Sequence, residues 1–208
     1  MSVNNRNIKA HKRIIFNGDG YAEAWQEEAA RRGLCNYKTT PDALPHFVDG
    51  KNLDLFTRHH IFTETEMYAR LEILLENYSK TLNIEALTMS EMVKKDILPA
   101  VANFTATLAA NVTAKRAVSP KLACTYETKT IERLAVLTDA TYANLTALDA
   151  AVADVPAHHT TALQCAIYYR DHVLTAMQTL RTTVDEMETL TAAEYWPFPT
   201  YGDLMFRT

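Results

Sequence analysis

The side chains of this chain that are best suited to chemistry are carboxylates in a stretch with helical spacing. Glu72 and Glu76 lie four residues apart and therefore share one helix face, and Glu85 follows further along the same stretch. Two carboxylates held close together can work as a general acid and a general base. Helix surfaces carry such pairs routinely, however, so the pattern favours a solvated helix face over a catalytic site.

Two pairs of adjacent histidines, His59-His60 and His158-His159, suggest metal binding. Adjacent residues of a helix point about 100° apart, so one such pair chelates a metal poorly unless it lies in a loop. Helical bundles that bind metals use Glu-x-x-His on facing helices, and no histidine of this chain follows a glutamate by three residues. The sequence therefore predicts no metal site built from this chain alone.

The tripeptide Arg170-Asp171-His172 has the composition of an acid–base cluster. On a helix, three consecutive side chains point in three directions, which argues against concerted catalysis. We expect Arg170 or Asp171 to form an ion pair with a neighbouring helix instead. The chain has no Gly-x-Ser-x-Gly motif, and no cysteine has a suitably placed base in the sequence, so we predict no catalytic residue.

The sequence NGDG at residues 17–20 lies between a short apolar stretch and a helical pattern, where phosphate-binding loops occur. A dinucleotide loop would need a third glycine where Glu23 stands. Asp19 and Glu23 would also repel a phosphate at the start of the helix. We therefore predict a plain turn here and no cofactor-binding residue.

The composition limits the remaining functions. The chain has 208 residues, 48% of them hydrophobic, and its net charge of −4 lacks the basic surface that nucleic acids need. We find no apolar run near the ~20 residues of a membrane span and no signal-peptide pattern. Cys35, Cys124 and Cys165 form no CxxC pair. We expect reduced thiols in a cytoplasmic protein without membrane or nucleic-acid partners.

The elements that must position these side chains are long helices. No glycine lies between Gly50 and Gly202, and so long a stretch without glycine is poor in turns. The first helical segment is predicted to start at Thr63, where Glu66 completes a capping box. Pro99 either kinks this helix or separates it from a second one.

A third helical segment is predicted to start at Ser119-Pro120, and a fourth to follow Pro156. Both are rich in alanine and threonine, and the apolar residues from Val173 to Met187 recur with the spacing of a coiled-coil seam. We favour an antiparallel coiled hairpin joined around residues 155–157, with a compact four-helix bundle as the alternative.

Both ends of the chain differ from this helical region. Residues 13–16, RIIF, predict a short strand, followed by the turn and by a helix over residues 21–32. In the tail, prolines alternate with aromatic residues, so we predict an extended segment. Its aromatic side chains would invite aggregation if left in water, and we expect them to dock on this chain's helices or on another subunit. These docking residues are Tyr195, Trp196, Phe198, Tyr201 and Phe206.

Several motifs follow one another in a distinctive order. They are HKRIIFNGDGY at residues 11–21, ARRGL at 30–34, KTTPDAL at 38–44, NIEALTM at 83–89, YYRDHV at 168–173 and AEYWPFPTYGDLMF at 193–206. This order resembles the C-terminal region of type III glutamine synthetases over nearly the whole chain. We expect a mainly α fold in three parts. Residues 1–50 would be the end of a catalytic domain, 51–194 a helical domain and 195–208 a docking tail.

The resemblance also implies a function. Glutamine synthetases ligate ammonia to glutamate with ATP and Mg²⁺ or Mn²⁺, in rings whose active sites lie between subunits. None of their catalytic motifs matches this sequence, so we expect an assembly-related part that is inactive alone and has no catalytic, cofactor or metal residue of its own. Its expected partners are the upstream catalytic domain and other subunits of the same homo-oligomer. The alternative is a stand-alone helical module for protein–protein interaction.

Overall fold

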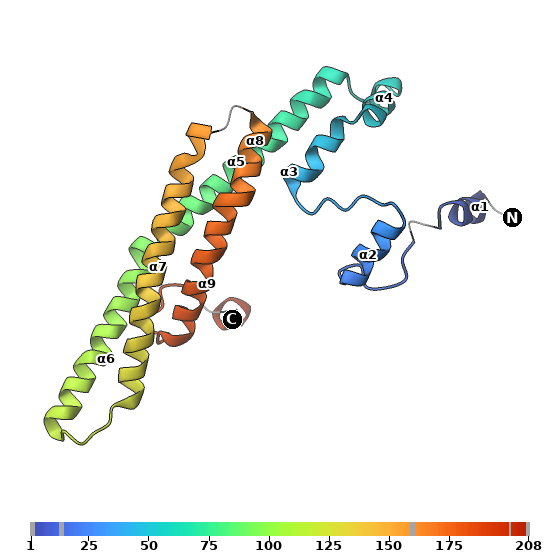
Figure 1. The fold of residues 1–208 in the computed structure, drawn as a ribbon. Coiled ribbons are helices and arrows are strands. Elements are labelled where there is room, and N and C mark those ends of the chain that lie inside the picture. The colour runs from blue at the N-terminus through green and yellow to red at the C-terminus, as the bar shows by residue number, and fades with distance from the viewer. Residues whose placement is uncertain (1–2, 13–14, 159–160, 200, 207–208) are drawn as a thin grey trace.

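The computed structural model describes residues 3–12, 15–158, 161–199 and 201–206 of the chain. These residues are mostly helical, and no strand occurs among them. The mainly α fold class is therefore confirmed. Figure 1 shows long helices packed side by side into a rod, with short helices from the N-terminal part at one end.

One continuous helix is the longest element of the fold (Figure 1). It consists of α5 (Glu64–Met92), a π-helical turn (Val93–Ile97) and α6 (Leu98–Val118). The helix neither breaks nor separates at Pro99, because the wider π turn just before it accommodates the missing backbone N–H of proline. The first of the two alternatives for Pro99, one long helix, is the one observed.

The start of this helix is the predicted one. Glu66 N–H donates to Thr63 Oγ1 at 3.3 Å, and Thr63 N–H donates to Glu66 Oε2 at 2.7 Å, which confirms the capping box. By length and composition the helix contains one window apolar enough to cross a membrane, a property that core helices of soluble proteins share. Its side chains Val101, Phe104 and Leu108 are buried in the helical rod.

The third helical segment begins later than predicted. α7 (Thr125–His158) starts after a chain reversal that begins with Ser119 and Pro120, so these two residues lie in a loop and do not start a helix. Ser119 is extended, with φ of −153°, because α6 stops at Val118 and the chain must turn back. Lys115 of α6 forms an ion pair with the buried Glu127 of α7, which joins the two helices across the reversal.

The fourth segment runs antiparallel to α7 and parallel to α5 (Figure 1). It consists of α8 (Ala162–Tyr168), a second π turn (Tyr169–Val173) and α9 (Leu174–Leu190). The predicted joint at residues 155–157 was placed too early. Pro156 lies within the last turn of α7, so the helix continues past it.

The core of the rod is a single cluster of apolar side chains from all the long helices. Thr141 of α7 is fully buried among them, and its hydroxyl donates to Met187 Sδ at 3.2 Å. The side chains of this cluster pack against one another within the chain. Its members with no exposed surface are Ala86, Leu134, Leu148, Val173, Leu180 and Met187.

The N-terminal part forms short helices. They are α1 (Val3–Ala10), α2 (Glu23–Arg31), α3 (Thr40–Ala43) with a following 3₁₀ turn (Leu44–Val48), and α4 (Gly50–Arg58). In Figure 1, α1 and α2 lie away from the long helices, whereas α3 and the 3₁₀ turn pack against α5.

The structure does not show the strand that the sequence predicts at residues 13–16. Ile15 and Phe16 have no regular structure, and residues 13 and 14 lie outside the described part of the chain. A strand needs a second strand to bond with, and the described residues offer none. Phe16 packs on Trp25 instead, with ring centroids 4.7 Å apart, and Arg32 donates to the backbone oxygen of Ile15 at 2.6 Å.

Candidate functional site

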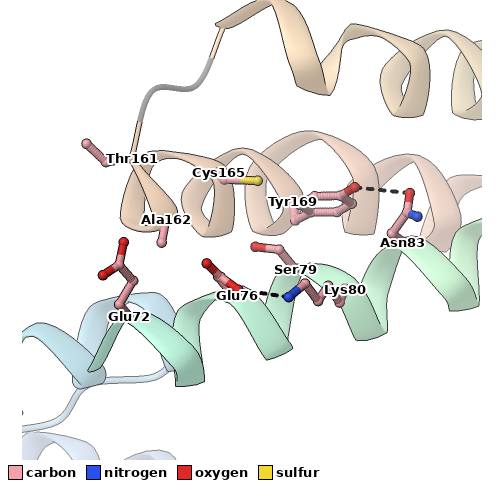
Figure 2. A pocket seen from close by; sticks show the side chains of 9 residues that line it. All are labelled: Glu72, Glu76, Ser79, Lys80, Asn83, Thr161, Ala162, Cys165 and Tyr169. Atoms are coloured by element: carbon pink, nitrogen blue, oxygen red, sulfur yellow. Dashed lines mark hydrogen bonds and ion pairs between the residues drawn. The ribbon is translucent and has the colours of Figure 1, made fainter. Parts of the chain in front are cut away.

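A polar pocket lies between α5 and α8 (Figure 2). Its volume is about 420 Å³, and Thr161, which caps the start of α8, is one of its lining residues. Side chains from both helices point into it. The lining residues are Glu72, Glu76, Ser79, Lys80, Asn83, Thr161, Ala162, Cys165 and Tyr169.

The polar groups of this pocket bond mostly to one another. Lys80 Nζ donates to Glu76 Oε2 at 2.8 Å, and Tyr169 OH donates to Asn83 Oδ1 at 3.0 Å, as the dashed lines in Figure 2 show. Ser79 donates back to its own helix, to the backbone oxygen of Leu75 at 3.1 Å. Burial raises the pKa of Tyr169, so this hydroxyl stays protonated and acts as a donor.

The structure brings together two of the three carboxylates that the sequence singled out. Glu72 and Glu76 line the pocket, whereas Glu85 lies at an apolar groove between α5 and α9. The bonding partner of Glu76 is Lys80 and not Glu72. The arrangement is that of an exposed helix face with an i, i+4 ion pair, as the sequence analysis favoured for these carboxylates.

A second polar cluster joins α3 to the π turn after α8. Arg170 Nη1 donates to Asp42 Oδ1 at 2.6 Å and to Thr39 Oγ1 at 3.3 Å. Its other nitrogens bond both oxygens of Asp171, at 2.6 and 3.0 Å. The predicted ion pair of Arg170 with another helix is therefore confirmed, and its partner lies 128 residues away. The ring of His172 stacks on Tyr168.

This cluster shifts the pKa of its members. The Thr39 hydroxyl, with a further contribution from Arg170, lowers the pKa of Asp42 below its usual 3.8. Hydrogen bonds from Arg170 likewise lower the pKa of Asp171, and its partners raise the pKa of Arg170. All three groups are charged at neutral pH, so the cluster holds ions in place and offers no group that exchanges a proton there.

Replacing Arg170 with methionine is expected to loosen α3 and the 3₁₀ turn from the long helices while the rod stays folded. The substitution keeps the length of the side chain and removes its bonds to Thr39 and Asp42. Amide hydrogen exchange across residues 40–48 should become faster, with little change across α7 and α9.

Two controls separate this effect from a general one. Arg181→Met removes an exposed pair with Asp185 inside α9 and should leave exchange of residues 40–48 unchanged. In the wild type, the ionised Asp42 contributes to the stability of the contact between α3 and the π turn. Because the folded pKa of Asp42 is lowered, this contribution is fully present above about pH 4 and is lost as the pH falls through the folded pKa. Unchanged exchange in Arg170→Met would show that the cluster does not hold α3.

The remaining candidate sites lie at helix ends and in a turn. His59 and His60 follow the end of α4, and both are exposed. His159 lies outside the described residues. Among the residues that the structure describes, no three or more His, Cys, Asp or Glu side chains gather as metal ligands would. In the NGDG sequence, Asp19 Oδ1 accepts from Tyr21 N–H at 2.9 Å, which is the hydrogen bond of a turn.

The tail is only partly extended, which corrects the prediction. After Pro199 no further proline interrupts the chain, and α10 (Tyr201–Met205) forms. Tyr195 donates to or accepts from Thr107 Oγ1 at 2.9 Å, and its ring packs on Phe104 of α6 with centroids 5.3 Å apart.

The other predicted docking residues fall into two groups. Trp196 and Phe198 are partly buried against the core, like Tyr195, whereas Phe206 is 76% exposed. Tyr201 begins α10, and its side chain lies outside the description. Tyr195 contacts Phe104 and Thr107 of α6. The sequence did not identify these two residues as its partners, since it showed only that Phe104 has helical spacing.

Comparisons with known proteins point in one direction. The model of the glutamine synthetase C-terminal domain family matches residues 1–116. A glutamine synthetase of Butyrivibrio fibrisolvens is 41% identical over 202 residues, which cover 96% of this chain and 28% of that protein. A glutamine synthetase of Bacteroides fragilis (strain YCH46) is 30% identical over 206 residues. The type-3 glutamine synthetase of Dictyostelium discoideum is 30% identical over 204 residues, 94% of this chain. The chain spans 27–28% of the length of these curated relatives.

Proposed function

We propose, from the premise that this chain belongs to the glutamine synthetase C-terminal domain family, that it contributes to subunit assembly of a type III enzyme and not to the chemical step. The enzyme as a whole would ligate ammonia to glutamate with ATP. The upstream catalytic part would bind the ATP and the Mg²⁺ or Mn²⁺ ions. The partners of this chain are that catalytic part and other subunits of the same cytoplasmic homo-oligomer.

One observation carries the assembly role. The core of the rod is closed among its own helices, yet large apolar side chains remain exposed along the outer faces of those helices. Exposed apolar side chains that gather on one helix face, as Ile84 and Leu87 do on α5, are characteristic of faces that meet another protein. The exposed residues are Ile73, Ile84 and Leu87 on α5 and Tyr126, Val136 and Tyr142 on α7.

The polar clusters support the second half of the proposal. In the pocket, Lys80 pairs with Glu76 along α5, and Tyr169 bonds to Asn83 across the two helices. In the second cluster, Arg170 pairs with Asp42 of α3, so these groups stabilise α5 and the contacts between neighbouring elements. A catalytic site would instead aim an acid, a base or a nucleophile at a common point where a substrate can bind. The pocket in Figure 2 presents mainly paired groups along an open helix face.

The isolated chain is expected to form no glutamine and to associate with itself. The first part is measured as glutamine formed from glutamate, ammonia, ATP and Mg²⁺ by the purified chain, against a complete glutamine synthetase as positive control. The second part is measured by light scattering on a dilution series of the wild-type chain. Glutamine formation would overturn the non-catalytic role, and a strictly monomeric chain at every concentration would overturn the assembly role.

A further inference from the structure

A stripe of exposed side chains runs along the outer face of α5 and ends in the π turn that follows it. Its members recur every three or four residues and therefore share one helix face. Ile84 and Leu87, at its centre, are 65% and 52% exposed, although both are large and apolar. We call this stripe the α5 seam. It comprises Glu76, Lys80, Ile84, Leu87, Glu91 and Lys95.

The charges of the α5 seam follow a symmetric order. Lys80 bonds to Glu76 at 2.8 Å, and Lys95 bonds to Glu91 with the same i, i+4 spacing. A glutamate therefore begins the seam and a lysine ends it, with the two apolar residues between the ion pairs. A helix with this order meets opposite charges when it lies against a copy of itself that runs the other way.

We propose that a second copy of this chain packs on the α5 seam, antiparallel, about a two-fold axis that passes between Glu85 and Ala86. Every member of the seam then faces a partner of suitable chemistry, because the facing positions are equally far from that axis. The facing pairs, each occurring twice, are Ile84 with Leu87, Lys80 with Glu91, and Glu76 with Lys95 of the partner subunit.

The charge order selects this occupant and this orientation. In a parallel pairing in register, Glu76 and Lys80 would each face their own like charge, which is destabilising. The antiparallel pairing turns all four charged positions into attractive contacts and closes the assembly at two copies, since a two-fold contact uses the same patch on both chains. The inference rests on the proposed assembly role and identifies the surface that performs it.

The size of the seam sets the expected strength. Its twenty residues extend over roughly 30 Å of helix, whereas a stable interface buries about 800 Å² on each partner. A single helix stripe is at the low end of that range. We therefore expect a weak dimer of the isolated chain whose population rises with concentration, and a contact that gains strength where further contacts join the subunits.

Two half-swap variants test the pairing. Glu76→Lys with Lys80→Glu, and separately Glu91→Lys with Lys95→Glu, each reverse one ion pair but keep its i, i+4 attraction inside the helix. Each variant alone then sets four like-charge contacts across the proposed interface. Dimerisation measured by light scattering should weaken by more than about tenfold in each. The helix content and melting temperature should stay close to wild type, which excludes misfolding as the cause.

The decisive measurement is the mixture of the two half-swap variants. Across a mixed dimer every facing pair is again attractive, so the mixture should associate as the wild type does although neither variant does so alone. The chain that carries all four substitutions should also dimerise. If the half-swap variants associate like the wild type, the proposed pairing through the α5 seam is wrong, and the seam faces solvent or a different protein. The assembly role would stand in that case. A wild type that stays monomeric would overturn both.

Discussion

Leu148→Ala is expected to lower the free energy of unfolding of the chain by about 3 kcal/mol. Leu148 has no exposed surface and lies in the middle of α7, the helix that contacts both α6 and α9. The substitution removes buried methyl groups and leaves a cavity, because helices this long cannot collapse locally around one position. For a chain of this size the melting temperature should fall by roughly 6–12 °C, which calorimetry or circular dichroism would measure.

Leu204→Ala is the matched control, since it removes the same atoms from a side chain that is 62% exposed. We expect its melting temperature to lie close to that of the wild type, because surface substitutions usually change stability by less than about 0.5 kcal/mol. Equal effects of the two substitutions would show that α7 is not the centre of the core. A larger effect at Leu204 would place α10 in a packed environment that the structure does not contain.

Local signals were the reliable part of the sequence. The capping box at Thr63 and Glu66 works within three residues, so its bonds could be predicted without any knowledge of the fold. The long stretch without glycine likewise predicted long helices. The mainly α fold follows from these features, and it is the part of the architecture that the structure confirms.

The predictions that depended on distant partners were weaker. RIIF has the composition of a strand, but a strand forms only beside another, and the described residues supply none. Pro99 and Pro156 both lie inside helices, because tertiary packing along the rod and one π turn outweigh the local preference for a break. Ser119-Pro120 has the pattern of a helix start, yet the chain reversal after α6 needs those residues for a loop.

The candidate site shows the same division. That Arg170 would form an ion pair could be predicted from its place on a helix, but its partner Asp42 is 128 residues away and could not. Tyr169 and Asn83, which meet at 3.0 Å across the pocket, belong to two separate motifs whose contact appears only when α8 packs on α5. The α5 seam could not be predicted from the sequence either. The spacing of Ile84 and Leu87 is equally compatible with a buried and with an exposed helix face, and only the structure shows that both are exposed.

Deleting residues 195–208 is expected to destabilise the isolated chain by about 3 kcal/mol, with a fall in melting temperature of roughly 6–12 °C. The deletion removes Tyr195, Trp196 and Phe198, which are partly buried against the core, and it uncovers the ring of Phe104. Each such side chain contributes about 1.5–3 kcal/mol when fully buried, and these three are buried in part. The bond between Tyr195 and Thr107 is lost as well.

Trp196→Ala and Phe206→Ala divide this effect between the two halves of the tail. Trp196 packs on the core, so its truncation should reproduce a large share of the deletion, whereas Phe206 is 76% exposed and its truncation should leave the melting temperature unchanged. A deletion with no effect on the melting temperature would mean that the tail does not pack on its own chain and docks on another subunit. An effect of Phe206→Ala on self-association alone would assign the end of the tail to the contact between subunits, since its ring is free to meet a partner there.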